Sequence, residues 1–283
     1  MTVDSDNWTK VISAKRPWFD LRLGELWQYR HLIFLFIRRD LRASYKQTVL
    51  GRLWIFIPTL ISTSVFTVIF GNIAKLSSDG APHSLFYMSG ILMWGFFNAC
   101  VVGNSNIFSA QAGLFSKVYF PRMVVYLANV GATLFSILLQ LVLFMALLLY
   151  LTSKGTVPGP NWAALLLPLL FIFSAGIALG VGAIVSSVTA KYRDLSFLLT
   201  YGMQLWMYGT AIIYPLSSIP EKYQLLATLN PITTIVETFR YGFLGTGSLP
   251  VEGLMFTALF TVLIFTTGLI VFNRFEATAM DTV

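Results

Sequence analysis

A run of basic residues near the N-terminus has the clearest capacity for chemistry in this sequence. Five lysines and arginines fall between positions 38 and 52, and one acidic residue, Asp40, interrupts them. Arginine guanidinium groups pair bidentately with phosphate oxygens, so the run predicts binding of a phosphate or pyrophosphate group. The same charges beside an apolar span would also anchor it to anionic headgroups, at about 1 kcal/mol each, and both interpretations stay open. The five residues are Arg38, Arg39, Arg42, Lys46 and Arg52.

A second charged feature is the pair Glu237 and Arg240, which lie three positions apart in a short apolar stretch. A helix brings residues i and i+3 onto one face, so this spacing predicts an ion pair. Ionisable residues at membrane depth need such partners. A structural pair that fixes a hairpin of the chain is favoured over one that contacts a substrate.

Catalysis has little support in the sequence. The chain has one cysteine, Cys100, and two histidines, His31 and His83, which the topology derived below places on opposite sides of a membrane. No G-x-x-x-x-G-K-[ST] sequence occurs, so the chain lacks the loop that cradles ATP phosphates. We therefore expect no catalytic residue, no metal and no cofactor bound by this chain. Proton-driven carriers usually hold carboxylates within their spans, and here the candidates lie in or near outer loops. They are Asp79, Glu221, Glu237 and Glu252.

The composition is that of a membrane protein. Hydrophobic residues make up 56% of the chain and charged residues 11%, whereas a soluble domain carries roughly 25% charged residues. The apolar residues form six blocks, and each block reaches roughly the 20 residues that a helix needs to cross ~30 Å of hydrocarbon, the fifth being slightly short. Because backbone polar groups in lipid must be satisfied within a segment, the predicted fold is an all-α integral membrane protein. The predicted spans are residues 53–74, 84–107, 122–150, 162–188, 197–214 and 254–273.

Lysine and arginine determine the predicted orientation. Fifteen of them lie in the N-terminal stretch, the loops 108–122 and 189–196, and the C-terminal tail, against four on the other side. The positive-inside rule then places both termini in the cytoplasm, and it explains the net charge of +7 without nucleic acid. The chain divides into a cytoplasmic N-terminus, residues 1–52, and a six-span domain, residues 53–283.

Three segments outside the spans have structure of their own. Leu26–Ile37 is apolar but too short to span, which predicts an amphipathic helix in the cytoplasmic interface. The cytoplasmic loop 108–122 has mixed polarity and predicts a short helix that stops before Pro121. The outer connection 215–253 is broken by prolines, and its part 232–244 predicts helices that dip into the membrane and return.

Five segments, in order along the chain, carry a resemblance to one family. They are Arg38–Trp54 (RRDLRASYKQTVLGRLW), Lys117–Arg122 (KVYFPR), Lys191–Leu195 (KYRDL), Tyr208–Pro220 (YGTAIIYPLSSIP) and Asn230–Gly245 (NPITTIVETFRYGFLG). Together they resemble the membrane subunit of type-2 ABC exporters for polysaccharides, the branch that moves O-antigen and teichoic acid chains.

The resemblance implies a permease without an ATPase site of its own. It implies a homodimer of six-span subunits around a central channel in the bacterial inner membrane, surrounded by membrane lipids. Two copies of a separate ATPase subunit would dock underneath and hold ATP and Mg²⁺. The cargo would be a lipid-linked polysaccharide, and the basic run near position 40 would hold its pyrophosphate at the cytoplasmic entrance.

The resemblance also implies that a helix over Ala110–Phe120 couples the permease to the ATPase, through Leu114, Phe115, Lys117, Tyr119 and Arg122. Most aromatic rings are expected to face lipid or to lie in the interfacial belts. A sugar polymer presents apolar C–H faces, so some rings are expected to bind these faces weakly and let the polymer slide through the pore. The candidates are Phe56, Phe66, Phe70, Tyr87, Phe96, Phe97, Trp206, Tyr208 and Tyr214.

Two alternatives remain open. The chain could export another cargo, such as a drug or a small lipid, by the same architecture. It could instead be an integral-membrane enzyme that modifies glycans, which predicts a cluster of histidine and aspartate, or a cysteine, near one interface. The sequence lacks such a cluster, and neither the sugar nor its chain length can be read from it.

Overall fold

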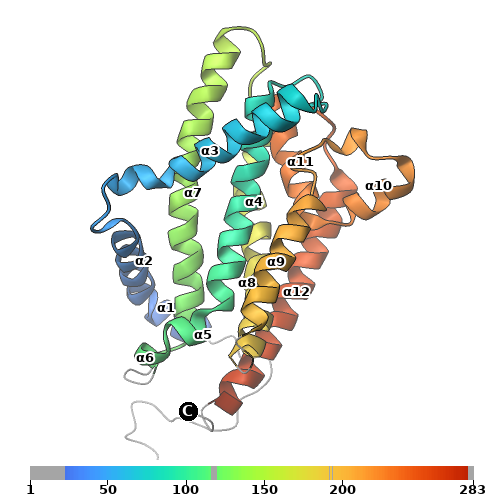
Figure 1. The fold of residues 1–283 in the computed structure, drawn as a ribbon. Coiled ribbons are helices and arrows are strands. Elements are labelled where there is room, and N and C mark those ends of the chain that lie inside the picture. The colour runs from blue at the N-terminus through green and yellow to red at the C-terminus, as the bar shows by residue number, and fades with distance from the viewer. Residues whose placement is uncertain (1–22, 116–119, 191, 193, 280–283) are drawn as a thin grey trace, which may run out of the picture.

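The computed structural model describes residues 23–115, 120–190, 192 and 194–279, and this described part is helical, with no β-strand (Figure 1). Five of its segments are long and apolar enough to cross a membrane. These findings confirm the all-α membrane fold and five of the predicted spans, with boundaries within a few residues. The five segments are Gly51–Ile73, α4 (His83–Ser105), α7 (Met123–Ser153), Trp162–Thr189 and Val251–Arg274, the last within α12 (Val251–Ala279).

The remaining predicted span, the fifth in chain order at residues 197–214, contains a shorter helix than predicted. Helix α9 (Leu195–Tyr208) has 14 residues, which corresponds to about 21 Å of helix and falls short of the hydrocarbon thickness. After Tyr208 the chain leaves the helix and reaches Pro215 through turns. The count of six spans therefore stays a prediction.

The first span is composite. It consists of a 3₁₀ turn η2 (Gly51–Ile55), helix α3 (Ile57–Phe66) and a π-helical segment η3 (Thr67–Ile73). Pro58 lies in the first turn of α3, where a missing backbone N–H costs nothing. Apolar side chains along this span, such as Ile61 and Val68, are exposed in the single subunit, so they are available to lipid or to another chain.

Helix α4 is the centre of the bundle. It is the most buried of the five candidate spans and contacts α3, α7, α8 (Leu167–Thr189), α9 and α11. The 3₁₀ turn η4 (Trp162–Leu166) precedes α8. Helices α8 and α12 cross closely because glycines face each other: a Cβ on Gly268 would lie 2.6 Å from the Cα of Gly180.

Two helices precede the first span. Helices α1 (Leu23–Gln28) and α2 (Arg30–Tyr45) include the predicted interfacial helix Leu26–Ile37, but α2 continues through the basic run to Tyr45. Helix α2 lies beside the lower part of α7 (Figure 1). Its buried face packs through Phe36, whose ring lies 5.7 Å from that of Phe120, and through Ile37, which reaches Gly131 of α7.

The outer connection folds into η5 (Leu216–Ser218), α10 (Glu221–Thr228) and α11 (Pro231–Leu244). Asn230 caps α11 by accepting a hydrogen bond from the backbone N–H of Ile232 at 3.1 Å, and Pro231 follows at the first helical position. Gly245 ends the helix in the left-handed conformation, with φ +69°. The helical prediction for residues 232–244 is confirmed, and its depth in a membrane stays a prediction.

Candidate functional site

Two of the five basic residues lie on one exposed face of α2. Arg38 and Arg42 are four residues apart and exposed, and Lys46 and Arg52 are exposed beyond the end of the helix. Arg39 differs from them. Its Nε donates to Asp40 Oδ1 at 2.8 Å, and its guanidinium carbon lies 4.7 Å from the centre of the Phe36 ring. Four of the five predicted phosphate-binding cations are therefore open to an anion, and Arg39 is partly neutralised within its own helix.

The connection between α4 and α7, which is the predicted cytoplasmic loop, is not the single helix predicted over Ala110–Phe120. Its described residues include two one-turn helices, α5 (Ile107–Ala110) and α6 (Ala112–Phe115), which are separated at Gln111. Gln111 has the conformation of a helix end, with φ −112° and ψ 16°. Two predicted coupling residues, Lys117 and Tyr119, lie outside the described residues.

The other predicted coupling residues pack against the bundle. The Phe115 ring lies 5.7 Å from Phe120 and 6.2 Å from Phe108. The Arg122 guanidinium covers Phe115 and Phe108, at 5.4 Å and 5.5 Å from their ring centres, and Leu114 is half-buried against the same cluster. Phe115 and Arg122 therefore fix the connection to the bundle, and the outward surface that a partner could contact lies at neighbouring positions such as Gly113.

Several aromatic rings predicted to line a pore are core residues of the subunit. Tyr87, Phe96 and Phe97 are fully buried, with 0% exposure. Phe96 packs edge-on against Phe171 at 5.1 Å, and Phe97 packs against Trp206 at 5.1 Å. These three rings therefore belong to the packed interior of the single subunit, and their assignment to a pore stays a prediction.

The remaining predicted rings are partly accessible. Phe66 and Phe70 are half-buried beside Tyr87, and Phe56 is half-buried near the start of α3. Tyr214 is half-buried and its Oη donates to the carbonyl of Tyr208 at 2.8 Å. Tyr208 is exposed and belongs to an exposed stripe on α9, at helical spacing. The stripe consists of Phe197, Tyr201, Leu205 and Tyr208.

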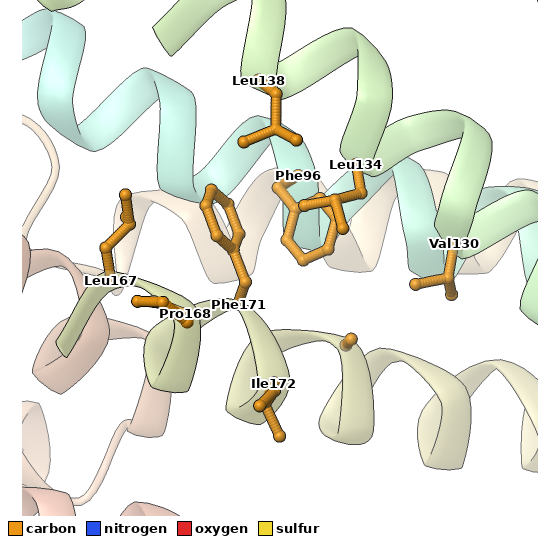
Figure 2. Close-up of a pocket in the computed structure, with 9 residues that line it drawn as sticks. Phe96, Val130, Leu134, Leu138, Leu167, Pro168, Phe171 and Ile172 are labelled. Atoms are coloured by element: carbon orange, nitrogen blue, oxygen red, sulfur yellow. The ribbon is translucent and has the colours of Figure 1, made fainter. Parts of the chain in front are cut away.

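An apolar groove of about 400 Å³ lies between α7 and α8. Figure 2 shows Leu134 and Leu138 of α7 facing Phe171 of α8, with Phe96 of α4 between them. All nine lining residues are apolar. Such a lining suits hydrocarbon and offers no hydrogen bond to a hydroxyl-rich ligand.

Arg240 forms the centre of a buried network beside the first turns of α4, at the end of the bundle that is predicted to face outward. Its side chain is 1% exposed, and Nη1 lies 3.1 Å from Glu237 Oε1, so the predicted ion pair is present. Nη1 also donates to the carbonyl of Ala211 at 2.6 Å, and Nη2 donates to the carbonyls of Ile212 at 2.8 Å and Phe86 at 3.3 Å. The guanidinium carbon lies 3.6 Å from the centre of the Phe86 ring. One side chain thus joins α4, α11 and the connection after α9.

Glu237 lies between this network and an outer cavity. Burial raises the pKa of the Glu237 carboxyl above its ordinary value, and the positive charge of Arg240 opposes part of that rise. The cavity has a volume of about 230 Å³, and Asp79, Ser217, Gln224 and Ser248 line it with Glu237. Sequence reasoning missed this cavity, because its lining comes from five separate segments that only the fold brings together.

Known proteins with similar sequences are described as export or transport proteins. The profile of the ABC-2 type transporter family matches residues 31–244, more than half of the chain. The O-antigen export system permease protein RfbA of Myxococcus xanthus is 28% identical over 76% of this chain and 81% of its own length. RfbA of Klebsiella pneumoniae is 26% identical over 87% of this chain and 92% of its own. The polysialic acid transport protein KpsM of Escherichia coli is 24% identical over 84% of this chain and 91% of its own length.

The match extends from α2, with its basic face, to the end of α11, with its buried Arg240. It therefore includes the cytoplasmic connection and the outer helices as well as the first spans. The chain belongs to the ABC-2 type transporter family.

Proposed function

We propose that this chain is the transmembrane subunit of an exporter that moves a lipid-linked polysaccharide across the bacterial inner membrane. The observation that carries the proposal is the likeness to RfbA and KpsM over most of both chains, since their names specify O-antigen export and polysialic acid transport. The five apolar spans and the family match support membership of a transport machine rather than of an enzyme.

The energy comes from a separate ATPase subunit that binds ATP and Mg²⁺. The absence of a phosphate-binding loop from the sequence supports this division of labour. Two ATPase subunits dock beneath a homodimer of this chain, with both termini in the cytoplasm. A second copy would cover exposed apolar side chains on α3 and on the α9 stripe, faces that are equally available to lipid.

The exposed face of α2 holds the pyrophosphate of the lipid-linked polymer as it enters. Helix α7 has 31 residues, about 46 Å, so it is longer than the hydrocarbon core is thick and can project into the cytoplasmic headgroup layer. Arg38 and Arg42 follow Ile37, which contacts α7 at Gly131, about 12 Å from its start. We propose that this end of α2 lies in the cytoplasmic headgroup layer, beside the lipid phosphates.

The test is export in the bacterium that carries the gene. Deleting the gene should remove the polysaccharide from the cell surface while the lipid-linked polymer accumulates inside, and the wild-type gene should restore export. A strain whose ATPase partner has lost its phosphate-binding lysine is the control for energy coupling and should show the same phenotype. Normal surface polysaccharide in the deletion strain, with no other permease gene present, would refute the proposal.

A further inference from the structure

The outer cavity beside Glu237 has the chemistry of a binding site for a hydroxyl-rich ring. Its polar lining comes from the loop between η3 and α4 at Asp79, η5 at Ser217, α10 at Gln224, α11 at Glu237 and the loop before α12 at Ser248. Its volume of about 230 Å³ is below the range of about 300–1,000 Å³ found for drug-sized ligands. The cavity therefore suits one small polar unit rather than a long segment of polymer.

The groups that face a ligand there are mostly hydrogen-bond acceptors. The Ser217 hydroxyl already donates its hydrogen to Asp79 Oδ1 at 2.7 Å. Gln224 donates through Nε2 to the carbonyl of Ile219 at 3.0 Å, which leaves its Oε1 as an acceptor. A lining of carboxylate, amide and hydroxyl oxygens needs a ligand that brings several O–H or N–H donors.

The Glu237 carboxylate is held in place for this role. Glu237 Oε1 accepts a hydrogen bond from Arg240 at 3.1 Å, and Glu237 is more than nine-tenths buried. The other oxygen, Oε2, lies near Gly247, where an added Cβ would be 3.4 Å from it. Gly247 has φ +76°, a conformation that glycine adopts without strain, and the backbone of Leu216 also hydrogen-bonds the Glu237 carboxyl.

A hydroxyl-rich ligand fits better than a metal ion. One oxygen of each carboxylate is already engaged by a hydrogen-bond donor, Ser217 on Asp79 and Arg240 on Glu237. The Arg240 guanidinium also places a fixed positive charge beside Glu237, which disfavours a second cation. An anionic ligand is disfavoured by the two carboxylates themselves.

We propose that this cavity is a subsite for a neutral saccharide unit at the outer side of the permease. The inference rests on the proposed function, because a polysaccharide leaving the membrane would present such units to this surface. The carboxylates select sugars by their vicinal hydroxyls and reject acidic sugars. The subsite would hold the emerging chain by one ring at a time, weakly enough for export to continue.

The experiment is saturation-transfer NMR on the full chain with its ATPase subunit in lipid nanodiscs, with methyl glucoside as the neutral probe and N-acetylneuraminic acid as the anionic one. Methyl glucoside should bind, and the anionic probe should bind about tenfold more weakly. Asp79→Asn should weaken methyl glucoside binding about tenfold, because a charge-assisted hydrogen bond becomes a neutral one. Asparagine tolerates the φ of +50° at this position, so the loop should keep its shape.

Two further variants define the outcome. Gln224→Leu should also weaken binding, whereas Glu221→Gln, which changes an exposed carboxylate of α10 outside the cavity, should leave it unchanged. Methyl glucoside that fails to bind the wild type, or binds Asp79→Asn and Gln224→Leu equally well, would overturn the proposal. If Ca²⁺ displaces methyl glucoside from the wild type but not from Asp79→Asn, the cavity is a cation site and the proposal is overturned. Export in the deletion and complementation test is measured separately, so loss of the subsite would not be confused with loss of the proposed function.

Discussion

Arg240 donates from Nη1 to the backbone carbonyl of Ala211 at 2.6 Å, a contact between residues 29 positions apart. Ala211 lies in the turns that follow α9, so its carbonyl needs a hydrogen-bond partner from outside that helix. The guanidinium supplies that partner and does the same for Ile212 at 2.8 Å. The break between α9 and α10 is therefore stabilised by a side chain of α11.

Replacement of Arg240 should destabilise the whole protein. Arg240→Gln leaves Glu237 buried without its counter-charge and removes donors from three backbone carbonyls, so we expect a loss of about 3–5 kcal/mol. Thermal unfolding of the purified protein in detergent, followed by size-exclusion chromatography, measures the change. Arg38→Gln replaces an exposed arginine and serves as the control, with little change expected. Equal melting temperatures for the two variants would contradict this role of Arg240.

The crossing of α8 and α12 should tolerate no side chain at its glycines. A Cβ on Gly180 would meet the backbone of Ile264 and Phe265, so Gly180→Ala must push the helices apart. We expect overpacking to cost about 1–3 kcal/mol. The matched control is Gly202→Ala in α9, where an added Cβ meets nothing within 4 Å. If Gly180→Ala unfolds at the same temperature as the wild type, α8 and α12 have space for the added methyl group and the predicted overpacking is wrong.

The spans can be predicted from the sequence because a segment that crosses hydrocarbon must be a long apolar helix, and the chain contains such segments as continuous apolar blocks. The sequence predicts the Glu237–Arg240 pair for a similarly local reason, the i, i+3 spacing on a helix. It does not predict that Phe96 and Phe97 are core residues, since apolar side chains face both lipid and core in a membrane protein. Nor does it predict the outer cavity, whose lining residues Asp79 and Glu237 meet only through tertiary packing.

The orientation can be checked by cysteine accessibility in a protein with Cys100 replaced by alanine. Lys154→Cys and Lys222→Cys, both at exposed positions, should react with a membrane-impermeant maleimide in intact spheroplasts. Asp194→Cys, also exposed, should react only after the membrane is opened. Labelling of Asp194→Cys in intact spheroplasts would contradict cytoplasmic termini. Wild-type Cys100 is fully buried and should stay unlabelled in the native protein, which serves as the control.

Docking of the ATPase should depend on the outward surface of the cytoplasmic connection. An added Cβ at Gly113 meets nothing within 4 Å, so Gly113→Trp should fold normally but obstruct a partner in that place. We expect co-purification of the ATPase to fall by more than tenfold, the effect of losing about 2 kcal/mol of interface energy. Lys222→Trp on α10 is the control, because it places the same bulk on the outer side. Undiminished co-purification with Gly113→Trp would exclude this surface as the docking site.

Export should depend on Arg38 and Arg42 more than on Arg39. The first two are exposed on one face of α2, whereas Arg39 is paired with Asp40 and stacked on Phe36. A hydrogen bond to a charged group is worth about 1.5–3 kcal/mol, so each lost phosphate contact should reduce export about tenfold.

The test uses the double variant Arg38→Gln with Arg42→Gln. This variant keeps eight of the ten lysines and arginines of residues 1–52, enough to keep the orientation. The readouts are surface polysaccharide and the lipid-linked polymer retained inside, at equal protein level. Arg39→Gln is the control, because it removes one positive charge from the same helix. Near-wild-type export by this variant would show that the loss of export depends on the position of the arginine on α2 and not on net charge. If the double variant exports normally, these arginines serve topology alone.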